Sequence, residues 1–208
     1  QSQLDSDANL ATLLHIIATR PLVLNAFLLR PPAPLDDNLD ISPLARIRLD
    51  GQRYQGIGQS TFSLQDEGSL LSLLDPDRER WTNLFRQQGL QPQEAERFLD
   101  QLQDYTDQND LRRLNGASSS DYHSQGLAPP PQRLMISPGQ VFNLLDAAKL
   151  EQPLRAMLPL ATTRSGQLHN LNTMPKDVIQ SIPGIDAALA QGLIDARQNK
   201  PFKDLADA

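Results

Sequence analysis

The sequence of 208 residues lacks cysteine and long apolar runs, and it has few aromatic residues. Without cysteine there is no thiol catalysis, no disulfide bond and no cysteine-ligated metal site. A transmembrane helix needs about 18 to 20 consecutive apolar residues. The most apolar stretch is interrupted by Arg20 and Pro21, so we expect no segment of this sequence to cross a bilayer. A hydrophobic content of 39% with 5% aromatic residues suits a soluble protein with modest cores.

Basic residues are scarce as well. The chain has 19 lysines and arginines against 25 aspartates and glutamates, which gives a formal net charge of -6. Affinity for nucleic acids and anionic membranes depends on lysine and arginine side chains that neutralise phosphate. The composition therefore argues weakly against both kinds of partner.

The common catalytic motifs are also missing. The sequence has no GxSxG elbow, no Walker or dinucleotide glycine pattern and no HExxH pair. Asp66 and Glu67 form an acidic pair, but neighbouring residues on the strand that we expect here point to opposite faces. Such a pair cannot work as acid and base on one substrate, so we expect no enzymatic activity.

The N-terminal region is predicted to begin with a helix from Asp7 to Ile17. Its apolar residues recur at helical spacing, and they are Leu10, Leu13, Leu14 and Ile17. This stripe is a candidate surface for binding a partner helix. Packing against the chain's own strands explains the same pattern equally well.

Strands are expected only between about Leu44 and Gln65. Apolar and polar residues alternate there, and Asp50-Gly51 between the alternating runs predicts the turn of a β-hairpin. Two or three strands fit this region, which is marginal for an independent sheet. From Asp75 onward the chain reads as helical, with Asp75 as the cap of the first helix before Pro76.

An acidic, polar loop follows the second of these helices. Calcium binds six to eight oxygen atoms of carboxylates, carbonyls and amides, and this loop is rich in such groups. The candidate calcium ligands are Asp104, Asp107, Asp110 and Asp121. Their spacing is not that of an EF-hand, and aspartate-rich loops are often solvated turns and helix caps.

The C-terminal segment from His169 to Asp207 reads as helix, Pro-Gly turn, helix. This pattern predicts a helix-hairpin-helix, with Pro183 and Gly184 in the turn and Asp186 at the start of the second helix. DNA-binding hairpins leave the amides of that helix free to hold a phosphate. A carboxylate at Asp186 would bind those amides itself and repel phosphate, so we expect a packing module and no nucleic-acid partner.

Three segments in this order resemble the minor pseudopilin K family of the type II secretion system. They are "FSLQDEGSLLSLL", "LQDYTDQNDLRRLNGASSSDY" and "LPLATTRSGQLHNLNTMPKDVIQSIPGI". The resemblance extends from about Leu44 to Ala208. It implies a mainly helical α+β fold, in which a small antiparallel pseudopilin-type sheet carries a large helical insert with sterile-alpha-motif-like and helix-hairpin-helix subdomains. Its expected domains are residues 1–30 (stalk continuation), 31–74 (pseudopilin β region), 75–165 (first helical subdomain) and 166–208 (second helical subdomain).

The resemblance also implies a function without catalysis. Members of the family form the tip of the pseudopilus with minor pseudopilins I and J, nucleate its assembly, and are held to the inner membrane by an N-terminal helix that this sequence does not contain. The resemblance thus implies a periplasmic location, with secreted substrates and the outer-membrane secretin as further partners, and some members bind calcium. The alternative is a DNA-binding protein of the competence type, because "HNLNTMP" followed by "IPGI" fits that class equally well.

Overall fold

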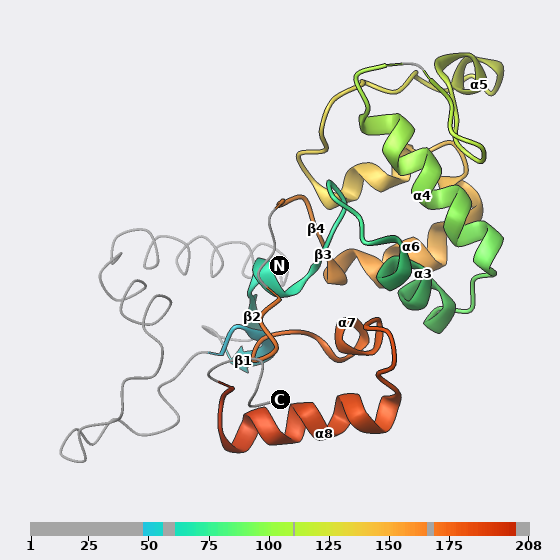
Figure 1. Ribbon diagram of the computed structural model, residues 1–208. Helices are drawn as coiled ribbons and strands as arrows, with labels where there is room; N and C mark the ends of the chain where they lie inside the picture. Colours follow the sequence, from blue (N-terminus) through green and yellow to red (C-terminus); the bar gives the residue numbers. More distant parts are fainter. Residues whose placement is uncertain (1–47, 56–60, 110, 166–168, 203–208) are drawn as a thin grey trace, which may run out of the picture. The chain divides into compact units, whose positions relative to one another are not determined.

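The computed structural model describes residues 48–55, 61–109, 111–165 and 169–202 (Figure 1). The chain forms two compact units, residues 1–65 and residues 66–208. The predicted N-terminal helix lies outside the described residues, and so does its apolar stripe of Leu10, Leu13, Leu14 and Ile17. Within the described ranges, no helix has the length and apolar character that a membrane span requires.

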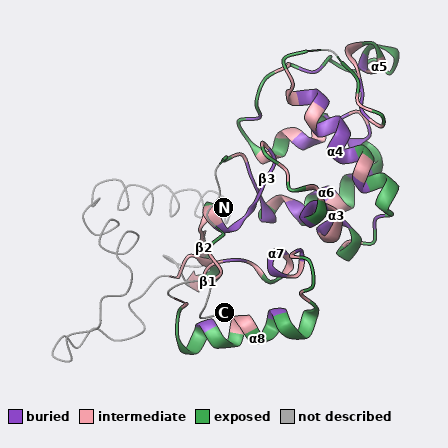
Figure 2. Cartoon of the chain, in the orientation of Figure 1, coloured by how far each residue is buried: buried purple, intermediate pink, exposed green. Residues whose placement is uncertain are grey.

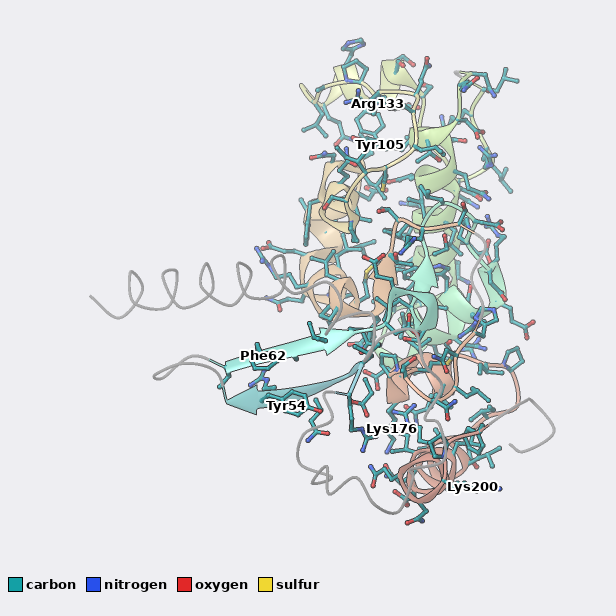
Figure 3. The ribbon with its side chains drawn as sticks, turned by 90° about the vertical axis from the view of Figure 1, so that its left-hand side faces the viewer. Tyr54, Phe62, Tyr105, Arg133, Lys176 and Lys200 are labelled. Atoms are coloured by element: carbon teal, nitrogen blue, oxygen red, sulfur yellow. The ribbon has the colours of Figure 1, made fainter. Side chains whose placement is uncertain are left out.

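The first unit contains an antiparallel pair of strands, β1 (Asp50–Gln55) and β2 (Thr61–Gln65). Tyr54 pairs with Phe62 across the two strands, and their rings stack with centroids 5.5 Å apart (Figure 3). Aromatic cross-strand pairs of this kind stabilise a sheet and fix its register.

The prediction of a hairpin turn at Asp50-Gly51 is wrong. Asp50 begins β1 and pairs with Gln65, and the register shifts between Asp50 and Arg53. Gly51 has φ +78, a conformation that suits glycine and that is common in β-bulges. The same dipeptide that favours a tight turn here forms an irregularity within the strand.

The second unit is mainly helical. Its elements are η2 (Glu67–Ser69), β3 (Leu71–Ser72), α3 (Arg78–Gln87), α4 (Pro92–Thr106), α5 (Ser119–Ser124), η3 (Pro138–Asn143), η4 (Ala147–Leu150), α6 (Glu151–Met157), η5 (Leu158–Leu160), β4 (Ala161–Thr162), α7 (Lys176–Gln180) and α8 (Ala187–Asn199). The strands β3 and β4 form a short parallel pair, extended by a hydrogen bond from the Leu73 amide to the Thr162 carbonyl at 2.9 Å.

Helix α3 begins two residues later than predicted. Asp77, and not Asp75, is its N-cap, and the Asp77 carboxylate accepts a hydrogen bond from the Arg80 amide at 3.1 Å. The Asp75 amide instead donates to Ser72 Oγ at 3.2 Å, which keeps Asp75 in the connection after β3.

The core of the second unit is continuous. Trp81 and Phe85 of α3 pack with Phe98 of α4, and the Phe85 and Phe98 rings meet edge to face at 4.8 Å. The same hydrophobic cluster extends to Val178, Ile179 and other residues of the C-terminal helices (Figure 2). Residues from both predicted helical subdomains therefore share one core.

Candidate functional site

Asp66 joins two of the segments that carry the family resemblance. It caps η2, since its Oδ1 accepts a hydrogen bond from the Gly68 amide at 2.9 Å. Its Oδ2 accepts from Asn170 Nδ2 and from Thr173 Oγ1, each at 2.9 Å. Ser69 reinforces the junction, because its hydroxyl donates to the Asp66 carbonyl at 2.6 Å. We call these four residues the motif junction: Asp66, Ser69, Asn170 and Thr173.

The prediction that Asp66 and Glu67 lie on a strand is wrong. Asp66 is a cap and Glu67 starts a short 3-10 helix. The Glu67 side chain is exposed, and its Oε2 lies 3.4 Å from Arg164 Nη1. The two neighbouring carboxylates thus have different surroundings, one bonded to distant segments of the chain and the other facing solvent.

Arg197 of α8 binds the turn at residues 170–174, which contains Asn170 and Thr173 of the motif junction. Its Nη1 donates to the carbonyls of Leu171 at 2.7 Å and Met174 at 2.6 Å, and the residue is buried. Asn172 adds a reciprocal pair of hydrogen bonds with the backbone of Phe202, at 2.9 and 2.8 Å. Arg197 therefore joins α8 to the turn through two main-chain carbonyls.

The predicted hairpin residues lie between α7 and α8. Gly184 adopts φ +82, which glycine allows without strain. Asp186 is the N-cap of α8, and its Oδ1 accepts from the amides of Ala188 at 2.9 Å and Leu189 at 2.8 Å. Pro183 and Gly184 are exposed. The amides that a phosphate would use in a DNA-binding hairpin are thus bonded to a carboxylate of the chain itself.

The acidic loop is organised by an arginine. Arg113 Nη1 lies 2.6 Å from Asp104 Oδ1 and 2.7 Å from Asp107 Oδ2, so one guanidinium bridges both carboxylates. Asp104 is buried, and its Oδ2 also accepts from the amides of Arg113 at 3.1 Å and Ala117 at 3.0 Å. A Cβ on Gly116 would lie 1.7 Å from Asp104 Oδ2, so only glycine permits this approach.

The remaining calcium candidates, Asp110 and Asp121, lie further along the chain. Asp121 forms a capping box at the start of α5, and hydrogen bonds from the Ser118 amide and hydroxyl, both at 2.8 Å, lower the pKa of its carboxyl group. Asp110 lies outside the described residues. In the parts of the chain that are described, no three acidic or histidine side chains are grouped to hold a metal ion. Calcium binding stays a prediction.

Two functional contacts of arginine side chains were not predicted from the sequence. Arg113 forms an ion pair with Asp104 in the acidic segment. Arg197 donates to the Met174 carbonyl in the turn at residues 170–174. A signal was present for Arg113, because "NDLRRLNG" places basic residues inside a run of carboxylates. No comparable signal exists for Arg197, whose acceptors are main-chain carbonyls of a distant turn.

These features define an α+β protein with a largely helical second unit, in which polar side chains join segments that are distant in the sequence. Residues 63–195 match the model of the family described as type II secretion system (T2SS), protein K. The match covers well over half of the chain, and the chain belongs to this family.

Comparison with solved structures gives the same fold. The protein is similar to a chain in the crystal structure of the GspK-GspI-GspJ complex from the type 2 secretion system of enterotoxigenic Escherichia coli, with a TM-score of 0.55 and 14% sequence identity. The similarity covers 99% of this chain and 76% of the other. Comparison with curated protein sequences gave no match.

Proposed function

We propose that this chain is the periplasmic part of a minor pseudopilin that forms the tip of the type II secretion pseudopilus and nucleates its assembly. The observation that carries the proposal is the family match over residues 63–195. The protein acts by shape and contact, without catalysis, and an N-terminal helix anchors it in the inner membrane.

The partners that we propose are minor pseudopilins I and J. The similar structure belongs to a complex of GspK, GspI and GspJ, which supports an equivalent assembly for this protein. The predicted stripe of Leu10, Leu13, Leu14 and Ile17 would supply one contact surface, because an amphipathic helix buries its apolar face against a neighbouring helix. Secreted substrates and the secretin are further candidate partners.

The size of the helical unit supports a place at the end of the pseudopilus. Residues 66–208 form one compact unit with a shared core. This unit cannot rearrange into a slimmer shape without disrupting that core. A subunit within the shaft needs neighbours above and below it, and a body of this size would obstruct them. A tip position leaves the helical unit free on one side.

We also propose that α7, α8 and their connecting turn form a helix-hairpin-helix that serves packing rather than DNA binding. The capping of α8 by Asp186 supports this role, since a phosphate at the same amides would meet a carboxylate. The sterile-alpha-motif-like architecture of the helical part and calcium binding by the acidic loop belong to the same proposal. Calorimetric titration with calcium, combined with thermal unfolding, tests calcium binding. The absence of both a binding heat and a shift of the unfolding temperature would contradict it.

Size-exclusion chromatography with light scattering tests the main proposal. The chain is mixed with the soluble parts of its candidate partners I and J, and a parallel sample receives duplex DNA at low salt. We expect a stable complex with the pseudopilins that is unaffected by DNA. A DNA complex that weakens steeply with salt, with no complex between the proteins, would instead identify a nucleic-acid-binding module.

A further inference from the structure

A pocket of about 310 Å³ lies between the β3–α3 connection and the segment before α7. Its lining combines two apolar residues with five polar or charged ones, and the residues are Leu71, Ser72, Asp75, Pro76, Asp77, Arg80 and His169. All of them belong to the second unit. Pockets of about 300 Å³ and more suit small ligands, and a few convergent polar groups fix the ligand's orientation.

The positive side of this pocket is Arg80, which is only 5% exposed. Among the described residues it takes part in no salt bridge. Its guanidinium donates to Ser181 Oγ and to the Val178 carbonyl, both at 3.3 Å. Burial lowers the pKa of Arg80, and the Asp77 charge only partly offsets this effect. A buried cation without a carboxylate in contact is costly, so an anionic group beside it would be stabilising.

His169 extends the positive side. Arg80 Nη1 lies 2.9 Å from His169 Nδ1 and 3.3 Å from Nε2. Arginine only donates hydrogen bonds, so the imidazole must present an unprotonated nitrogen to it. Partial desolvation of the imidazole and the Arg80 charge lower the pKa of His169, while Asp77 acts in the opposite direction. A bound anion would relieve the repulsion between Arg80 and a protonated His169.

The lining also carries two carboxylates, Asp75 and Asp77. Asp75 and Asp77 are both exposed, and Asp77 already caps α3. No described residue bonds to the Asp75 carboxylate, which leaves it available to a ligand. The pocket thus combines groups of both charges, and Leu71 and Pro76 add apolar surface. We call Arg80 and His169 the cationic wall, and Asp75 and Asp77 the anionic rim.

From this arrangement we propose that the pocket binds a small zwitterion, with its carboxylate toward Arg80 and His169 and its ammonium group toward Asp75 and Asp77. A simple anion would be repelled by the two carboxylates, and a simple cation by Arg80. A ligand with both charges satisfies both sides. The chemistry fits a free amino acid or short peptide, and equally a lysine two residues from an aspartate on an extended protein segment, where both side chains lie on one face.

Calorimetric titration of the full chain tests the proposal with four probes: glycylglycine, acetate, methylamine and the capped tripeptide acetyl-Lys-Gly-Asp-amide. His169→Ala removes part of the cationic wall and Asp75→Asn removes the free carboxylate of the rim. Both positions are exposed, so both variants are expected to fold, which the fluorescence of the buried Trp81 checks. His123→Ala and Asp195→Asn are matched controls at exposed positions that do not line the pocket. Arg80 is left intact because it also braces α3 against α7.

We expect one of the two zwitterionic probes to bind, and acetate and methylamine to bind about tenfold more weakly, as the loss of one charged hydrogen bond implies. Each pocket variant should bind the zwitterion with an affinity lowered by a similar factor. The control variants should bind it as the wild-type chain does. Binding of glycylglycine assigns a free ligand, whereas binding of the capped peptide alone assigns a protein segment. The proposal is overturned if neither zwitterion binds, or if both pocket variants bind as the wild-type chain does.

Discussion

Asp66→Asn tests how much the motif junction contributes to the stability of the helical unit. Asp66 Oδ2 accepts hydrogen bonds from Asn170 and Thr173. A hydrogen bond to a charged group contributes about 1.5–3 kcal/mol. The substitution removes the charge and replaces one acceptor oxygen by an NH2 group, which cannot accept a hydrogen bond. An NH2 group in the place of Oδ2 loses the bonds from Asn170 and Thr173. The flipped amide keeps these two bonds in weaker, uncharged form and loses the bond from the Gly68 amide. Because Asp66 is only half-buried, we expect a loss of about 2 kcal/mol in the free energy of unfolding.

Urea unfolding followed by the fluorescence of Trp81 measures this loss. Trp81 is the single tryptophan of the chain and is fully buried in the core of the same unit. The neighbouring substitution Glu67→Gln is the control, because Glu67 is exposed and exposed ion pairs contribute about 0–1 kcal/mol. Equal effects of the two substitutions, or an Asp66→Asn variant as stable as the wild type, would show that the motif junction does not stabilise the helical unit.

Three further predictions follow from the described contacts. Gly116→Ala should destabilise the chain by about 1–3 kcal/mol in urea unfolding, because its Cβ would overlap the buried carboxylate of Asp104; an unchanged midpoint would contradict this close approach. Asp186→Ala should cost about 1 kcal/mol through loss of the α8 cap and should not create DNA binding in a mobility-shift assay; a DNA shift would show that the carboxylate alone blocks a phosphate site. NMR titration should give His169 a pKa below 6.5. Since the folded state then binds fewer protons than the unfolded state, stability falls as the pH drops through 6.5 toward that lowered pKa; a His169 pKa above 6.5 would contradict the contact with Arg80.

Local sequence signals predicted the cap at Asp186 and the helical character of the chain after Asp75. A cap depends on residues a few positions away, so both partners are visible in one short segment. The cap of α3 was placed two residues early, at Asp75 instead of Asp77, because Asp75-Pro76 and Asp77 offer competing starts. The Ser72 hydroxyl, which holds the Asp75 amide, decided between them.

The joining of distant segments could not be predicted in the same way. Asp66 and Thr173 are 107 positions apart, and nothing in either segment indicates its partner. Arg113 is closer to its carboxylates, but its role depends on a loop that folds back toward Asp104 over Gly116. At Gly51 the local signal is present but ambiguous. The conformational freedom of glycine suits a β-bulge as well as a turn, and the pairing of the strands selects between them.

We expect this protein to join minor pseudopilins I and J in one complex. The most direct measurement is calorimetric titration of the chain into a premixed sample of the soluble parts of both partners. Our account predicts a saturable heat that ends at equal molar amounts of the three proteins and that persists in the presence of duplex DNA. No heat with the pseudopilins, together with salt-sensitive heat on addition of DNA, would contradict it.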